Sequence, residues 1–234
     1  MIEMVRRFVR QKFTSPGIAI ALGALALLET MGWAFSGGQR DFTVASWGIF
    51  LLAAGSVSRD AGSGALQMIL SRPIRRTRYL FGRYLGIVLS FAAFLTATCL
   101  LILLARAGAV RSGAASEGFA GALGAAAGAT FFNAVLQGAI LLFFSTFLPG
   151  LADLLGFLLL FLALNLPRAS RAEWLRRAAE VLRENMIPAV DWNEVLRGVG
   201  VLGPATGRWV FALAVHLVLA AVVFSRRELP YGQD

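Results

Sequence analysis

The sequence predicts an all-α integral membrane protein that forms a single transmembrane domain over residues 1–234. Of these residues, 58% are hydrophobic and only 15% are charged, whereas about a quarter of the residues in a soluble domain are charged. The same composition excludes a disordered chain. Because a helix needs roughly 20 apolar residues to cross the hydrocarbon core, the apolar runs predict six transmembrane helices. They lie at about residues 17–35, 42–57, 79–105, 119–148, 151–166 and 206–224.

Residues 1–16 precede the first span and have the pattern of an amphipathic helix that lies in the membrane interface. Ile2, Val5, Val9 and Phe13 recur at helical spacing, while arginines fill the opposite face. An ordinary positively charged flank of the first span is an equally good interpretation. Both interpretations remain open at this point.

The basic residues predict the orientation, because cytoplasmic loops carry an excess of lysine and arginine. Twelve of the 22 basic residues belong to the amino terminus, the carboxyl terminus, or the second loop with the start of the third span. The first and third loops hold three. Both termini are therefore predicted to be cytoplasmic. Seven arginines in and near residues 167–205 oppose this assignment, and we expect that segment to fold against the outer membrane surface.

The net charge of +9 indicates a membrane surface rather than nucleic acid. The basic residues cluster between apolar runs, where lipid headgroups are the nearest anions. Lys12 is the only lysine, and so strong a preference for arginine is typical of GC-rich bacterial genomes. We therefore expect a multi-pass protein of the bacterial cytoplasmic (inner) membrane, with the lipid bilayer as a partner and no nucleic acid.

Residues 167–205 are predicted to form an extracytoplasmic interfacial segment with two short helices before the last span. Ser170 and Glu173 have the spacing of a capping box, and Glu173 is placed to pair with Arg177. An apolar stripe follows at Trp174, Leu175, Ala178, Leu182 and Met186. Asp191 and Glu194 indicate a second helix start. An extracytoplasmic protein is a candidate partner for this segment.

Enzymatic chemistry is not predicted for this chain. A P-loop needs glycines before a lysine, but Lys12 stands in Gln11-Lys12-Phe13-Thr14. His216 and Cys99 are the only histidine and cysteine, so the usual ligands of a metal site are lacking. We expect a non-catalytic subunit with no cofactor and no metal of its own.

Several polar residues fall at membrane depth, where they should not face lipid. Thr130, Asn133 and Gln137 lie at i, i+3 and i+7 on one face of the fourth span, His216 lies in the last span, and Glu29 in the first. Hydrogen bonds between helices are the favoured interpretation, and a translocation path lined by Thr130, Asn133, Gln137 and His216 is the alternative.

Small residues indicate close packing of helices. They recur at four-residue spacing at Gly121, Gly124, Ala125 and Gly128, and Gly82 and Gly86 repeat the pattern. Such spacing lets backbones approach closely. It supports a tightly packed bundle and, more weakly, a dimer.

The loop at 58–78 is predicted to form a cytoplasmic elbow. Its glycines end the second helix, Leu66 to Leu70 can form a short apolar turn, and Pro73 pushes Arg72 toward extended geometry. Docking to a soluble partner and a solvated basic flank are equally good interpretations of these features, because basic loops also bind anionic lipid.

The order of features in this loop resembles the permease subunits of type-2 ABC exporters. The matching residues are Asp60, Gly64, Leu66, Leu70, Ser71, Pro73, Arg76, Gly82, Arg83 and Gly86. The likeness extends to an amphipathic amino terminus, six spans and a structured fifth loop. The loop near residues 145–153 is too short and uncharged to predict a second contact.

This resemblance implies the transmembrane half of an exporter, paired with itself as a homodimer or with a sister permease. Separate ATPase subunits would bind ATP and Mg²⁺. In that family the segment after the second helix is a coupling helix that docks on the ATPase. The resemblance assigns this role to Asp60, Gly64, Leu66, Leu70 and Pro73, supported by Arg72, Arg75 and Arg76. The alternative within the same family is a membrane scaffold that transmits ATPase movement to an extracytoplasmic partner without moving a substrate.

Overall fold

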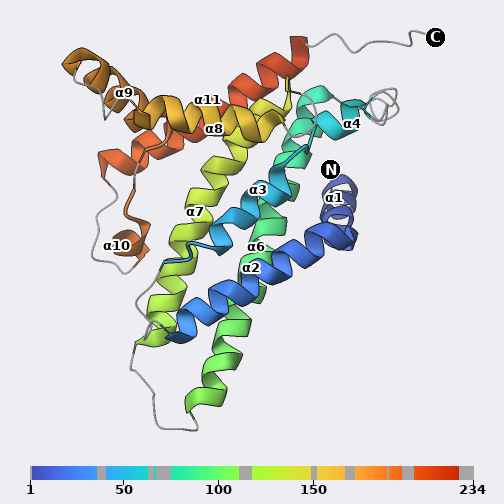
Figure 1. Cartoon of the computed structure of the whole chain (residues 1–234). Helices are drawn as coiled ribbons and strands as arrows, with labels where there is room; N and C mark the ends of the chain where they lie inside the picture. The colour runs from blue at the N-terminus through green and yellow to red at the C-terminus, as the bar shows by residue number, and fades with distance from the viewer. Residues whose placement is uncertain are drawn as a thin grey trace.

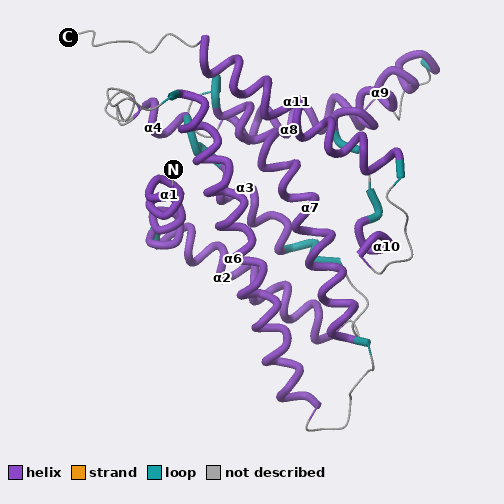
Figure 2. Tube along the Cα trace, turned by 180° about the vertical axis from the view of Figure 1, so that it is seen from behind, coloured by secondary structure: helices purple, strands orange, loops and turns teal. Residues whose placement is uncertain are grey.

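In the computed structural model, the described residues form helices joined by loops, with no strand among them (Figure 2). The described residues are 2–35, 41–62, 66, 75–110, 118–148, 152–166, 172–188, 190–196 and 203–226. Four helices are long and apolar enough to cross a membrane, namely α2 (Pro16–Phe35), α6 (Arg76–Val110), α7 (Phe119–Ser145) and α11 (Pro204–Arg226). The protein is therefore an all-α protein embedded in a membrane.

The other two predicted spans have a different form. Residues 42–57 contain the short 3₁₀ helix η1 (Ala45–Trp47) and the α-helix α3 (Gly48–Ala53), followed by a turn and α4 (Ser58–Gly62). Residues 151–166 contain α8 (Ala152–Asn165), whose 14 residues extend about 21 Å at 1.5 Å per residue. The hydrocarbon core is about 30 Å thick. The count of six spans therefore remains a prediction.

The helices are arranged around α6 and α7, which pack against each other (Figure 1). Helix α6 also contacts α1 (Ile2–Thr14) and α2, while α7 contacts α8 and α11. The shared core contains fully buried aliphatic side chains from α3, α6 and α7: Ile49, Leu52, Ile87 and Leu141. Large apolar side chains on the outside of the bundle, such as Leu104 and Phe211, are exposed, as lipid-facing residues are in a membrane protein.

The amino-terminal segment is the predicted amphipathic helix, α1, but it packs through a face that the sequence pattern did not single out. Phe8 and Lys12 are its buried residues, while Ile2 and Phe13 are exposed. A Cβ added at Gly86 of α6 would lie 2.5 Å from the Phe8 ring. The small residue at Gly86 therefore allows α1 to approach α6 within one chain.

The glycines of α7 differ in what they contact. A Cβ at Gly128 would lie 2.5 Å from a methyl group of Leu196 in α10 (Trp192–Leu196), so this glycine gives close packing inside the chain. At Gly121 and Gly124, a Cβ would meet nothing within 4 Å in the part of the chain that is described. Among the glycines of the predicted stripe, Gly128 therefore makes close contact within the described chain, whereas Gly121 and Gly124 do not.

The described part of residues 167–205 contains α9 (Glu173–Met186) and α10 before α11 begins, in agreement with the predicted pair of short helices. The predicted ion pair between Glu173 and Arg177 is confirmed, with 2.5 Å between Oε1 and Nη2. The predicted capping box stays a prediction: the helix begins at Glu173, with Ala172 as its N-cap residue. Ser170 lies outside the described residues. Trp192 is buried against Phe132, with ring centroids 4.5 Å apart, which fixes α10 to α7.

Candidate functional site

A tight turn interrupts the chain between α3 and α4, at the start of the predicted coupling segment. Ala54 has φ −52° and ψ 126°, and Gly55 has φ +63°. The Ser56 N–H donates to the Ala53 carbonyl at 3.0 Å. These angles and this bond define a type II β-turn, which requires a positive φ at its third residue and therefore favours glycine there. A side chain at Gly55 would also meet Arg59, whose Nε is 2.8 Å from the added Cβ.

The central peptide unit of this turn is held on both sides by buried charged residues. Its oxygen, the Ala54 carbonyl, accepts a hydrogen bond from Lys12 Nζ at 3.2 Å. Its N–H, that of Gly55, donates to Asp153 Oδ2 at 2.7 Å. Lys12 is 6% exposed and Asp153 is 0% exposed. Because a buried peptide group without a partner is strongly unfavourable, Lys12 of α1 and Asp153 of α8 together stabilise the turn.

The connection between α7 and α8 contributes a second polar contact to the same stretch. The Val57 and Ser58 N–H groups donate to Ser145 Oγ at 3.0 and 3.3 Å. Asp153 also accepts a hydrogen bond from the Leu154 N–H at 2.9 Å, and it lies in the first turn of α8, where a negative charge is favourable. Ser145 at the end of α7 and Asp153 at the start of α8 therefore both bind residues 55–58.

A third cluster fixes the first turn of the coupling segment to α6. Tyr79 donates its hydroxyl to Asp60 Oδ2 at 2.5 Å, and Arg83 forms an ion pair with the same oxygen. Arg83 Nε also donates to the Tyr79 hydroxyl at 3.1 Å, and its guanidinium lies 5.0 Å from the ring centre of Phe8. The Arg83 and Asp60 side chains are only 9% and 13% exposed. This pairing satisfies both charges in a nearly dry environment.

We call this set of contacts the junction. It comprises residues 53–58 together with Lys12, Asp60, Tyr79, Arg83, Ser145 and Asp153. It joins α1, α4, α6, α7 and α8 at one end of the bundle, where Figure 1 also shows the end of α11. A displacement of the segment that begins at Asp60 would therefore act on all of these helices at once.

The electrostatics of the junction make Lys12 an unusual lysine. Burial lowers its pKa from 10.5 to about 8, and the positive charges of Arg59 and Arg83 act in the same direction. The negative charge of Asp153 opposes them. The Lys12 ammonium is therefore less stable than an ordinary surface ammonium, and it loses its proton more readily.

The structure places the predicted coupling residues in different environments. Asp60 lies in the junction, and Leu66 is fully buried within the main core. Arg75 is exposed, while Arg76 donates from Nη1 to the Ser225 carbonyl at 3.0 Å, near the end of α11. Buried Asp60 and Leu66 anchor the segment to the bundle. The other four residues assigned to this role, Gly64, Leu70, Arg72 and Pro73, lie outside the described residues.

A cavity of about 710 Å³ lies beside the middle of α7. Thr130, Asn133 and Gln137 line it together, as their spacing on one helix face predicted. The remaining wall comes from residues 41–46 and from residues 187–192, including the acidic Asp41 and Asp191. The Thr130 hydroxyl also donates to the Ala126 carbonyl of its own helix at 2.9 Å. The cavity therefore has polar and apolar walls, and three segments distant in sequence share it.

His216 and Glu29 do not line this cavity as the structure describes it. The sequence predicted a hydrogen bond from His216 to a neighbouring helix. In the structure, Nδ1 lies 2.7 Å from the Ala212 carbonyl of the same helix. Glu29 is fully buried and accepts a hydrogen bond from the Ala45 N–H at 2.7 Å. It therefore fixes the start of η1 to α2.

Sequence reasoning missed Lys12 and Asp153 as partners of one peptide unit. The only lysine of the chain was a signal, as was an aspartate at the edge of an apolar run.

No group of three or more histidine, cysteine or acidic residues that could hold a metal occurs in the described ranges. No family model matches this chain, and no curated protein matches it in sequence.

Proposed function

We propose that this chain is the transmembrane permease subunit of an ABC transporter, in which a separate ATPase subunit drives export of a substrate across the bacterial cytoplasmic membrane. The proposal takes the predicted six spans, with residues 42–57 and α8 as the two shorter ones, and two copies or a sister permease in the complex. The observation that carries it is the anchoring of the 58–78 segment. Asp60 binds Tyr79 and Arg83 at its start, and Arg76 binds the end of α11 at its finish.

This anchoring supports a coupling role because force applied to the segment has direct routes into the bundle. One route passes through Asp60 to α6, and another passes through the turn at Gly55 to α1 and α8. In the proposed cycle, ATP binding by the partner favours one arrangement of the helices and hydrolysis releases it. The chain itself carries out no covalent step.

The cavity beside α7 fits the proposal as part of a substrate path. Its polar wall combines Asn133 and Gln137 of α7 with Ser46 of η1 and with Asp191, which immediately precedes α10. A relative movement of these segments would change the shape of the pocket. The same elements connect to the junction through α3 and α7.

The proposal is tested by isolating the tagged chain from membranes of cells that express it with its neighbouring genes. We expect an ATPase with P-loop peptides to co-purify, together with ATP hydrolysis. Arg75 is exposed at the end of the coupling segment, so Arg75→Glu should reduce the bound ATPase by about tenfold through charge repulsion. Arg176→Glu, on exposed α9, is the matched control and should have no effect.

Two outcomes would contradict the proposal. One is a purified chain to which no P-loop ATPase binds. The other is an equal loss of ATPase in Arg75→Glu and Arg176→Glu, which would indicate a nonspecific response to lost positive charge.

A membrane scaffold is the second candidate function, and the surface of α9 favours it. Trp174, Val181 and Leu182 are exposed there, and Arg208 of α11 ties α9 to the bundle through Glu184 at 2.6 Å. A photoreactive residue at Trp174 distinguishes the two functions. Cross-linking to one extracytoplasmic protein would favour the scaffold, and cross-linking to lipid alone would favour the exporter.

A further inference from the structure

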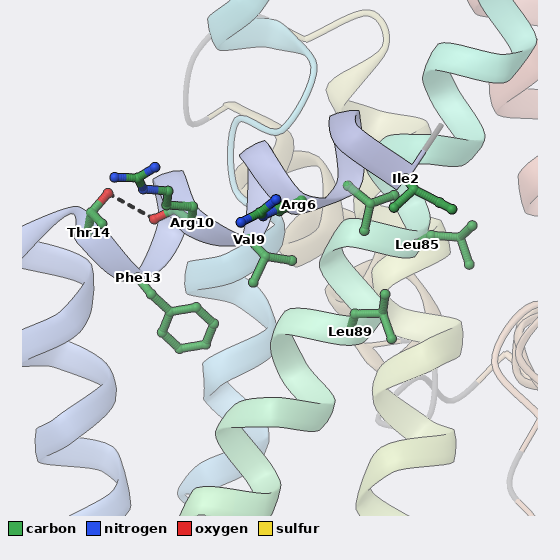
Figure 3. A pocket seen from close by; sticks show the side chains of 9 residues that line it. Ile2, Arg6, Val9, Arg10, Phe13, Thr14, Leu85 and Leu89 are labelled. Carbon is green, nitrogen blue, oxygen red and sulfur yellow. Dashed lines mark hydrogen bonds between the residues drawn. The ribbon is translucent and has the colours of Figure 1, made fainter.

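An apolar groove of about 790 Å³ runs between α1 and α6 (Figure 3). Val9 and Phe13 of α1 form one side, and Leu85 and Leu89 of α6 form the other. Leu89 is 51% exposed and Phe13 is 37% exposed, so this surface is not covered by the described chain. The volume lies within the range of about 300–1,000 Å³ that is usual for sites of small molecules.

The two arginines of the groove define its chemistry. Arg6 and Arg10 line it, and they are one helical turn apart on the same side of α1. Both are exposed. The neighbouring Arg7 does not line the groove and forms an ion pair with Glu3, with 3.2 Å between Nε and Oε1. No acidic side chain is among the described residues that line the groove, so its charged groups are all cationic, and Thr14 adds a hydroxyl that donates to the Arg10 carbonyl.

An apolar groove with a cationic edge fits an amphiphile with a negative head. Guanidinium groups match the geometry of phosphate oxygens, and arginines on the polar face of an interfacial helix attract anionic lipid. A free phosphate would use Arg6 and Arg10 but would leave the apolar walls uncovered. An uncharged lipid would cover the walls but would leave the two arginines without a counter-ion.

We propose that this groove is a binding site for one anionic phospholipid. Its acyl chain lies against Val9, Phe13 and Leu89, and its phosphate lies between Arg6 and Arg10. The site depends on the membrane location of the protein and goes beyond the proposed coupling function. It also has a consequence for the junction, since the same helix carries the buried Phe8 and Lys12. A lipid that holds α1 in place stabilises the bond from Lys12 to the turn.

Native mass spectrometry of the full-length chain in detergent tests the site, with phosphatidylglycerol and phosphatidylcholine added in equal amounts. We expect one phosphatidylglycerol to be retained in preference to phosphatidylcholine. Each arginine near a lipid surface contributes about 1 kcal/mol, so Arg6→Gln with Arg10→Gln should weaken retention by roughly 30-fold. Arg7→Gln is the matched control and should retain the lipid like the wild type.

A second variant tests the apolar part of the site. Val9→Trp fills the groove and should reduce retention while Arg6 and Arg10 remain in place, and thermal unfolding of each variant checks that it is folded. Equal retention of both lipids, or an equal loss in Arg7→Gln and in the double variant, would overturn the proposal. So would a dimer that Val9→Trp dissociates, because a second copy would then be the occupant of the groove.

Discussion

Polar groups are buried and hydrogen-bonded at the junction, whereas they face an open volume at the cavity beside α7. At the junction, Lys12 and Asp153 are buried and bonded to one peptide unit. At the cavity, Asn133 and Gln137 face an open volume of about 710 Å³. Buried polar groups with fixed partners specify one arrangement, whereas an open polar wall can accept a ligand. Under the proposed function, the junction transmits force and the cavity binds the substrate.

Among the substitutions considered, Asp153→Ala should cause the largest loss of stability. Asp153→Ala leaves the Gly55 N–H without a partner and Lys12 without its nearest negative charge. We expect a loss of about 3 kcal/mol in the free energy of unfolding, measured by thermal and denaturant unfolding in detergent. Asn133→Ala, at the cavity, should lose less than about 1 kcal/mol because Asn133 is exposed on the open wall. Equal losses at the two sites would remove the distinction between them.

The pH dependence of stability should come from the junction as well. With a pKa of about 8 when folded and 10.5 when unfolded, Lys12 binds more protons in the unfolded chain between these values. Stability therefore rises as the pH increases from about 8 to 10.5, by about 3 kcal/mol at most. Below pH 8 this contribution is constant. Lys12→Met should abolish the rise in unfolding temperature across this window, and an unchanged rise would show that another group causes it.

A substitution at the Gly55 turn should have a smaller effect on stability. Gly55→Ala places a Cβ at a positive φ and against Arg59, and it should lower the free energy of unfolding by about 1–2 kcal/mol. Gly121→Ala in α7 is the matched control, and it should change the free energy of unfolding in the opposite direction. Nothing lies within 4 Å of its added Cβ, so better helix propensity should stabilise the protein by up to about 1 kcal/mol. Stabilisation by both substitutions would argue against the strained turn.

The cavity should give the smallest effects on stability. Asn133→Leu and Gln137→Leu each remove a polar group from an open wall, and polar contacts inside membrane proteins contribute about 0.6 kcal/mol on average. We expect changes in unfolding temperature close to the error of measurement, with a clear loss of export in a transport assay. A large loss of stability without loss of transport would assign these residues to packing instead.

The sequence predicted the long helices well and the junction poorly. Helices α2, α6, α7 and α11 follow from continuous apolar runs, which is the strongest signal that a membrane sequence carries. The break at Gly55 was not predicted, because a type II turn depends on two dihedral angles and leaves the apolar run around it intact. The bond from Gly55 to Asp153 joins residues 98 positions apart, and no local pattern encodes such a distance.

The candidate sites show the same division. The helical spacing of Thr130, Asn133 and Gln137 predicted that they share a face, and they line one cavity. The opposite wall at 187–192 depends on how α10 packs on α7, which the sequence alone does not specify. In α1, spacing identified the apolar stripe that includes Phe13, but Phe8 is the residue that packs on Gly86. The buried face was set by the neighbouring helix.

The proposed function requires residues 58–78 and α9 to lie on opposite sides of the membrane, and cysteine labelling can determine whether they do. In a Cys99→Ser background, Arg75→Cys and Arg176→Cys each place one thiol at an exposed position. With an impermeant maleimide, we expect labelling of the Arg176→Cys variant in intact spheroplasts, and of the Arg75→Cys variant only after the membrane is opened. Labelling of the Arg75→Cys variant in intact spheroplasts would rule out a cytoplasmic position for residues 58–78.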